Sequence, residues 1–191
     1  MKSAPHIIGL AGTFASGKDT LAHHLVEKYG YLHVSTGDIV RVEAQRQRGS
    51  IERPVLFEVA NMQRHKYGAG YFAKQALAQL DKHPEATGIL VTGLRSLGEA
   101  RAIVEAGGVL VFVDAPIEAR YDRMKNRQRD QEVALSLDEF RKNEAKEWHA
   151  GDDEADFNLG GIRDMATVRL ENTADLQTFL STAEAKLSLS E

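Results

Sequence analysis

The 191-residue sequence contains no cysteine, and it lacks long apolar runs and any strong excess of charge. Without cysteine it can form neither a disulfide framework nor a thiolate metal site. No apolar run approaches the roughly 18 residues of a membrane span, and the N-terminus lacks the layout of a signal peptide. A net charge of −4 argues against nucleic acid as the main partner. We therefore expect a cytoplasmic protein, without a membrane partner, that forms a single domain over 1–191.

Short apolar runs alternate with longer amphipathic ones along the chain. The expected strands are 6–11, 31–35, 88–92, 109–113 and 167–171. The expected helices are 18–29, 37–48, 54–66, 70–82, 97–106, 116–126, 137–148 and 174–187. The first, third and fourth strands are almost continuously apolar, which is typical of parallel strands covered on both faces. The alternation predicts an α/β fold with a doubly wound parallel sheet and right-handed crossovers.

A glycine-rich stretch, GLAGTFASGKDT at 9–20, joins the first expected strand to the first expected helix. Gly12 to Lys18 fits the pattern G-x-x-x-x-G-K, in which backbone N–H groups and the helix N-terminus cradle a polyphosphate. A turn that merely packs is the alternative. The lysine, the register and the flanking elements together favour the phosphate loop. The predicted ATP-binding residues here are Gly12, Thr13, Ala15, Ser16, Gly17, Lys18, Asp19 and Thr20.

Asp19 stands where many such loops have a serine or threonine that ligates Mg²⁺. A carboxylate beside phosphates is repelled by them unless a cation lies between, so Asp19 is a candidate Mg²⁺ ligand, directly or through water. An acidic residue in the first turn also interacts favourably with the helix dipole. The sequence leaves both interpretations open.

A second segment, HVSTGDIVR at 33–41, follows the second expected strand and opens a helix. Thr36 and Gly37 lie at the carboxyl end of that strand, on the sheet edge where open α/β sheets bind ligands. Arg41 lies one turn into the helix, from where a guanidinium can point back to a bound phosphate. In the local alternative, Thr36 or Asp38 caps the helix and Arg41 is solvated.

Three segments resemble P-loop kinases and occur in the order of that superfamily. STGDIVR resembles the monophosphate-binding segment of adenylate kinases. VTGLRSLGEA at 91–100 resembles the strand-end G-x-R of nucleoside monophosphate kinases, and especially a segment of archaeal adenylate-kinase-like and dephospho-CoA-kinase-like proteins. VDAPIEARYDRMKNR resembles the Asp-x-Pro strand end and the helix whose two arginines, Arg123 and Arg127, begin the lid.

The resemblance implies a role for each matching residue. Lys18 would neutralise the transferring phosphoryl group, and Arg123, with Arg127, would close over ATP. The implied acceptor-binding residues are Thr36, Gly37, Arg41 and Arg95. The implied catalytic residues are Lys18, Arg95 and Arg123. The resemblance also implies a five-stranded P-loop kinase fold with a helical acceptor-binding insertion at about 36–82 and a short lid at about 123–136.

The sequence departs from the family pattern at two places. Thr92 stands where adenylate kinases have an aspartate that orients the Mg²⁺ water shell, and Asp19 or Asp38 are the candidates to replace it. STGD stands where dephospho-CoA kinases have Asp-Ala-Asp, which favours the nucleoside monophosphate kinases.

The sequence therefore predicts an enzyme that uses ATP and Mg²⁺ to phosphorylate a small phosphorylated acceptor, with a nucleoside monophosphate favoured. A dephospho-CoA kinase or another small-metabolite kinase is the alternative on the same fold. An ATP-binding switch or assembly factor is the alternative of another class, although it has no evident use for Arg41 and Arg95. The arginines of 123–129 also suggest a nucleic-acid patch, which the missing interleaved aromatic residues argue against.

Overall fold

The computed structural model describes residues 6–126 and 135–189 of the chain. In this part, five parallel strands form one sheet in the order β2-β3-β1-β4-β5. The strands are β1 (Ile7–Gly12), β2 (Leu32–Ser35), β3 (Ile89–Thr92), β4 (Val109–Asp114) and β5 (Val168–Glu171). Each bound lies within one residue of its prediction, and the parallel sheet confirms the predicted α/β class.

Helices connect and cover the strands. They are α1 (Lys18–Tyr29), α2 (Thr36–Arg48), α3 (Arg53–Tyr67), α4 (Tyr71–Leu77), the short 3₁₀ helix η1 (Leu80–Lys82), α5 (Leu97–Glu105), α6 (Ile117–Asn126), α7 (Leu137–Trp148), α8 (Leu159–Met165) and α9 (Leu176–Leu187). The single helix predicted over 70–82 is divided between α4 and η1. The seven-residue α8 was not predicted. Its two glycines and its short length hide the helical periodicity in the sequence. At its N-terminus, Oδ1 of the capping residue Asn158 accepts a hydrogen bond from the Gly161 N–H.

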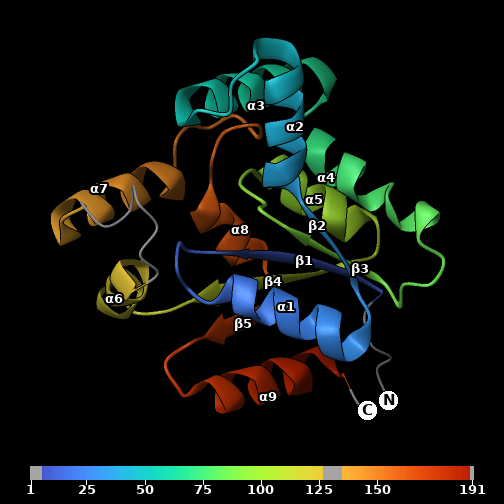
Figure 1. Cartoon of the computed structure of the whole chain (residues 1–191), viewed down its shortest axis with the longest axis vertical. Coiled ribbons are helices and arrows are strands. Elements are labelled where there is room, and N and C mark those ends of the chain that lie inside the picture. Colours follow the sequence, from blue (N-terminus) through green and yellow to red (C-terminus); the bar gives the residue numbers. More distant parts are fainter. Residues whose placement is uncertain (1–5, 127–134, 190–191) are drawn as a thin grey trace.

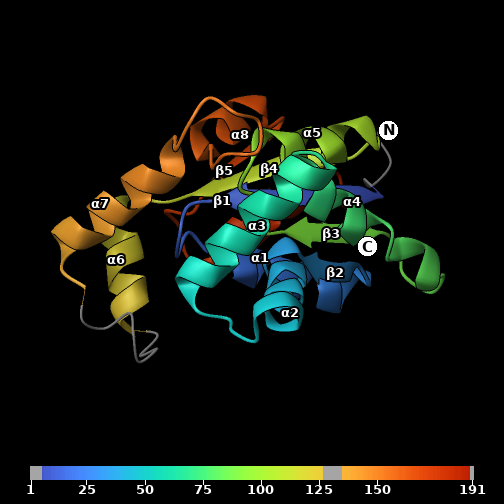
Figure 2. The same cartoon turned by 90° about the horizontal axis from the view of Figure 1, so that it is seen from above.

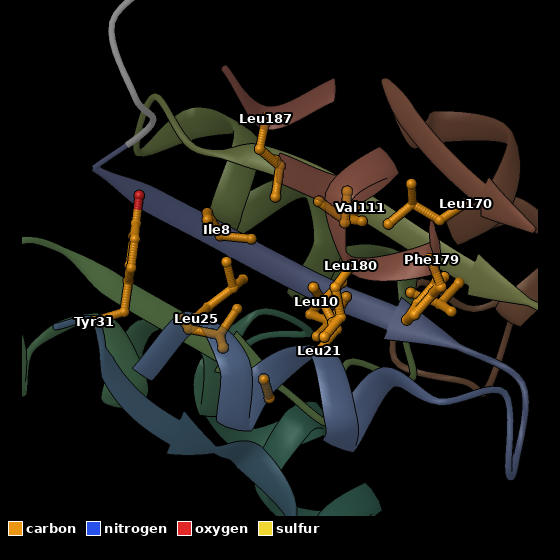
Figure 3. Close-up of a cluster of buried hydrophobic side chains, with 14 residues drawn as sticks. Ile8, Leu10, Leu21, Leu25, Tyr31, Val111, Leu170, Phe179, Leu180 and Leu187 are labelled. Atoms are coloured by element: carbon orange, nitrogen blue, oxygen red, sulfur yellow. The ribbon is translucent and has the colours of Figure 1, made fainter. Parts of the chain in front are cut away.

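One face of the sheet packs against α1 and α9, as Figure 3 shows for its central side chains. Ile8 and Leu10 of β1 meet Leu21 and Leu25 of α1 on this face, and Phe179 packs in from α9. All five side chains are buried, and burial of each contributes roughly 1.5–3 kcal/mol. This core fixes α1, and therefore the start of α1, against the end of β1.

The opposite face of the sheet packs against α4, α5 and α8. Gly9 of β1 faces this side, where a Cβ would come within about 3 Å of Ile103 and Leu94. Small residues in β1 thus let α5 approach the centre of the sheet closely. Each helix layer covers one face, which agrees with a doubly wound arrangement.

Two further pairs of helices lie beyond these layers, of which α2 and α3 also pack against α4. Figures 1 and 2 show α2 and α3 packed on each other, and α6 and α7 together at one side of the sheet. Because the strands are parallel, all their carboxyl ends lie at one edge. Within 6–126 and 135–189, every helix is too short or too polar to cross a membrane.

Candidate active site

The predicted phosphate loop runs from Gly12 to Lys18 and joins β1 to α1. Neither end glycine has room for a side chain. A Cβ on Gly12 would lie 2.1 Å from the backbone oxygen of Val113, and one on Gly17 would lie 2.3 Å from Nδ2 of Asn172. Gly17 also has a φ of 100°, which residues with a Cβ rarely adopt. The packing of this loop therefore requires glycine at both positions.

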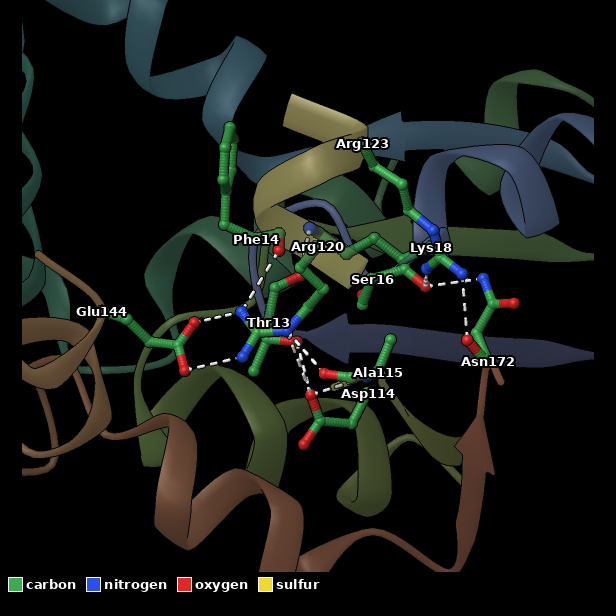
Figure 4. A network of polar contacts seen from close by, with 10 residues as sticks. All are labelled: Thr13, Phe14, Ser16, Lys18, Asp114, Ala115, Arg120, Arg123, Glu144 and Asn172. Atoms are coloured by element: carbon green, nitrogen blue, oxygen red, sulfur yellow. Dashed lines mark hydrogen bonds and ion pairs between the residues drawn. The ribbon is translucent and has the colours of Figure 1, made fainter. Parts of the chain in front are cut away.

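Neighbouring strand ends hold the loop in place (Figure 4). Oγ1 of Thr13 donates to Oδ1 of Asp114 at 2.6 Å, and Nδ2 of Asn172 donates to the backbone oxygen of Ser16 at 2.8 Å. Arg123 donates to the backbone oxygens of Asn172 at 3.0 Å and Ser16 at 3.4 Å. Contacts from β4, β5 and α6 thus fix the loop independently of any ligand.

Two groups in the loop fit a phosphate ligand. The hydroxyl of Ser16 is buried and has no hydrogen-bond partner among the described residues, an arrangement that costs about 1–3 kcal/mol unless a ligand satisfies it. Nζ of Lys18 donates to the backbone oxygen of Thr13 at 3.2 Å, so the side chain folds back over the loop. A phosphate oxygen bound here would accept from both side chains.

Arg120 of α6 belongs to the same arrangement, although no motif in the sequence singled it out. It is 3% exposed, and its Nε donates to the backbone oxygen of Ala115 at 2.7 Å. Its guanidinium pairs through both terminal nitrogens with Glu144 of α7 and reaches the backbone oxygen of Phe14 at 3.4 Å. The available signal was its position in α6 three residues before Arg123, since residues i and i+3 of a helix share a face.

A cleft of about 820 Å³ opens beside the loop, between it and α2, α3 and α7. Lys18 and Asp19 line the loop side of the cleft. The predicted acceptor-binding residues all line it as well, namely Thr36, Gly37, Arg41 and Arg95. The structure therefore brings together, in one cleft, residues that lie up to 77 positions apart in the sequence (Lys18 to Arg95).

A second hollow, of about 420 Å³, is lined by other residues of the loop and of α1 than those that line the cleft. Gly17, Thr20 and Arg123 line it, together with Asn172 from the end of β5. None of these four residues lines the cleft that holds the predicted acceptor-binding residues.

The acceptor-side residues make local contacts in this structure. Oγ1 of Thr36 donates to the backbone oxygen of Gly93 at 2.8 Å and does not cap α2. Arg41 pairs with Asp38 at 2.5 Å, on the solvent-exposed side of the cleft. Arg95 pairs with Glu147 of α7, a partner that the sequence did not predict. Each arginine therefore contacts a carboxylate with which an anionic ligand would compete.

The predicted metal ligand, Asp19, is exposed at the first turn of α1 and lines the same cleft as Lys18. A lone carboxylate beside a phosphate site fits Mg²⁺, which is usually bound by one or two carboxylates together with substrate phosphates. Across the described parts of the chain, no cluster of three or more histidine or acidic side chains could hold a metal by itself. Thr92 shares a hydrogen bond with Nε2 of His33 at 2.8 Å.

The predicted lid lies largely outside the described residues. Residues 127–134, which include the predicted lid residue Arg127, lie outside the described residues. The described ends of the segment are the last turns of α6, which carry Arg123, and the capping box of Ser136 that begins α7.

The loop, the sheet order and the flanking helices define a P-loop kinase fold. A solved shikimate kinase from Bacteroides thetaiotaomicron has the same fold, with a TM-score of 0.58, 13% identity, and coverage of 95% of this chain and 98% of that one. A family model described as AAA domain matches residues 11–141, so the chain belongs to the AAA domain family.

Archaeal proteins resemble nearly the whole chain. A UPF0200 protein of Halobacterium salinarum is 33% identical over 178 residues, which cover 91% of this chain and 87% of the relative. A UPF0200/UPF0201 protein of Archaeoglobus fulgidus is 30% identical over 178 residues and 91% of this chain, but the match spans only 52% of that relative's length. These names state no activity.

Proposed function

We propose that this protein transfers the γ-phosphoryl group of ATP to a small phosphorylated acceptor, and that the favoured acceptor is a nucleoside monophosphate. The observation that carries the proposal is the shared cleft, which Lys18 and Asp19 line together with Thr36, Arg41 and Arg95. Two arginines suit a phosphate because each can form charge-assisted, paired hydrogen bonds to it.

The chemistry needs positioning and charge neutralisation more than a reactive side chain. Lys18 would hold the β- and γ-phosphates against the backbone of the loop, and Ser16 would donate to a phosphate oxygen. Arg41 and Arg95 would hold the acceptor phosphate so that its oxygen approaches the γ-phosphorus in line. Arg123 would neutralise charge on the ATP side. Mg²⁺, held by Asp19, would supply further neutralisation of the phosphates.

The same proposal assigns parts of the chain to substrates. The insertion at about 36–82 would form the acceptor side, the segment at about 123–136 would be a short lid, and the cytoplasm would be the compartment. The hollow lined by Gly17 and Asn172 is suitable in size and position for the base of ATP. Lid closure would exclude water and so limit ATP hydrolysis.

An acceptor panel tests the proposal. ADP formation is measured with purified protein, ATP and Mg²⁺, alone and with AMP, CMP, UMP, GMP, their deoxy forms, TMP and dephospho-CoA, with shikimate and gluconate as acceptors that lack phosphate. We expect a monophosphate to raise ADP formation well above the acceptor-free rate. A clear preference for dephospho-CoA would instead favour the alternative kinase. ATP binding with no stimulation by any acceptor would favour an ATP-dependent switch.

A further inference from the structure

Arg64 of α3 is the most unusual charged residue in the cleft. It is 3% exposed, yet it lines the cleft wall beyond the predicted acceptor residues. Its Nε and Nη2 both donate to Oε1 of Glu99, at 3.2 and 3.0 Å, while its Nη1 has no hydrogen-bond partner in the part of the chain that the structure describes. A buried guanidinium with an unsatisfied N–H is unfavourable unless something else accepts from it.

Glu99 holds Arg64 in a fixed place relative to the end of β3. Glu99 is fully buried, and its second oxygen accepts from the backbone N–H groups of Arg95 at 2.8 Å and Ser96 at 3.3 Å. One carboxylate therefore ties the Arg64 guanidinium to the backbone of a predicted acceptor-binding residue. This pairing also balances the buried charge of Arg64, and the N–H groups of its Nη1 remain for a neutral or anionic partner.

Aromatic rings surround Arg64. Its guanidinium lies 5.6 Å from the ring centre of Phe157 and 5.5 Å from that of Phe72. Phe157 forms an edge-to-face pair with Phe57 at 5.5 Å, and both rings line the cleft. Phe57 is 50% exposed, which leaves an apolar ring surface without a partner. A flat ring can pack on such a surface.

We propose that Arg64 is a specificity residue, which recognises a keto oxygen on the base of the acceptor nucleotide. The proposal rests on the proposed function, because it assumes that the phosphate of the acceptor lies at Arg41 and Arg95. An arginine only donates hydrogen bonds, so it matches the oxygen of guanine, hypoxanthine or uracil. The exocyclic amino group of adenine is a donor and would face Arg64 donor to donor.

A matched pair of acceptors tests this assignment. Inosine 5′-monophosphate carries a keto oxygen at C6, and purine riboside 5′-monophosphate has hydrogen there. We expect kcat/KM to favour the inosine compound by about 10- to 100-fold, the range for a hydrogen bond to a charged group. GMP and UMP should likewise be preferred to AMP. Similar kcat/KM values for the matched pair, or a preference for AMP, would overturn the assignment.

The variant Arg64→Lys keeps the positive charge beside Glu99 but removes the second terminal nitrogen. We expect the preference for the keto acceptor to fall below about 3-fold, with the KM for ATP unchanged. Because the preference is a ratio measured on one preparation, partial unfolding of the variant does not change it. Arg46→Lys, on the exposed side of α2 and outside the cleft, is the matched control and should keep the wild-type ratio. An unchanged ratio in Arg64→Lys would leave Arg64 a purely structural partner of Glu99.

Titration calorimetry separates failure of this proposal from failure of the proposed function. If no monophosphate raises ADP formation, transfer to nucleotides is wrong. The inosine compound should still bind more tightly than its deoxygenated partner if Arg64 has the assigned role. Equal binding of the two compounds, or no binding of either, would overturn the assignment whether or not transfer occurs.

Discussion

Lys18 shows how much of the proposed chemistry depends on one side chain. It is the only lysine in the loop, and the backbone of Thr13 already orients its ammonium group. We expect Lys18→Ala to fold normally and to lower kcat by two or more orders of magnitude, because one preorganised charge contributes about 3–4 kcal/mol to a transition state. Steady-state ADP formation with the best acceptor measures this.

A surface variant, Lys82→Ala in η1, provides the control for loss of one positive charge. Near-normal turnover in Lys18→Ala would contradict the phosphate-loop assignment itself.

Ion pairs between distant residues were the part of the site that the sequence could not predict. The loop was predictable because its signal is local, a glycine spacing between a strand and a helix. Glu99 and Arg64 stand 35 positions apart, and Glu147 and Arg95 stand 52 apart. Nothing in either segment alone identifies the partner, since only the fold brings Arg64 of α3 near Glu99 of α5, and Glu147 of α7 near Arg95 after β3.

Among the elements, α7 contacts both sides of the site. Glu144 pairs with Arg120, which contacts the loop backbone, and Glu147 lies one turn further and pairs with Arg95 in the cleft. An acceptor phosphate that binds Arg95 competes with Glu147 for its guanidinium, so acceptor binding and the position of α7 are linked. The linkage follows from competition for one guanidinium.

Removal of that competitor should strengthen acceptor binding. We expect Glu147→Gln to lower the acceptor KM or Kd several-fold, with little change in the affinity for ATP. Asp138→Asn, which removes a negative charge from the exposed start of α7, should leave both affinities unchanged. A higher acceptor KM in Glu147→Gln would mean that Glu147 supports the active position of Arg95.

The contact between α1 and α9 predicts a pH dependence of stability. Glu184 of α9 accepts hydrogen bonds from Lys28 at 2.9 Å and His24 at 2.7 Å, and these, with Lys28 the larger cause, lower the pKa of Glu184 from 4.5 to about 2. The folded-state pKa lies below the unfolded value. The stabilisation is therefore complete above about pH 4.5 and is lost as the pH falls towards 2.

We expect Glu184→Gln to have a lower Tm than wild type at pH 7 and a shallower fall in stability between pH 4.5 and 2. Thermal unfolding across that pH range measures both. Glu105→Gln, at the exposed end of α5, is the control. Parallel pH profiles for Glu184→Gln and wild type would contradict the pairing.

At the scale of the whole molecule, residues of one loop line both the cleft and the second hollow. A dinucleoside polyphosphate with enough phosphates to reach from one to the other should occupy both. Linking two ligands makes the second contact intramolecular, so affinity should exceed that of ATP or the monophosphate alone by 10²-fold or more. Calorimetry measures the gain, and Arg41→Ala should remove most of it. If the dinucleoside polyphosphate bound only as tightly as ATP, the cleft and the second hollow would not be the binding sites of acceptor and ATP in one reaction.

The sheet as a whole was predictable because its strands are short, apolar and separated by helices of ordinary length. The order of the strands was not predicted, because the partners of each strand lie far apart in the chain. The shape of the cleft was not predictable, since α3, α7 and the residues around Phe157 meet there from separate parts of the chain. Local periodicity reports which elements exist, whereas side-chain packing decides what they enclose.

The strand order also sets a sequence of events during synthesis. β1 does not pair with β2, the strand that follows it in the chain. It pairs with β3 and β4, in which Leu90 and Val109 lie beside Ile8. A growing chain that has exposed only its first eighty residues therefore has the phosphate loop but no neighbouring strand to hold it. The last fixing contact, from Asn172 to Ser16, forms only when nine-tenths of the sequence has left the ribosome. The fully fixed loop therefore exists only in an almost finished chain, so ATP that binds this form stabilises the product of folding and does not guide its early steps.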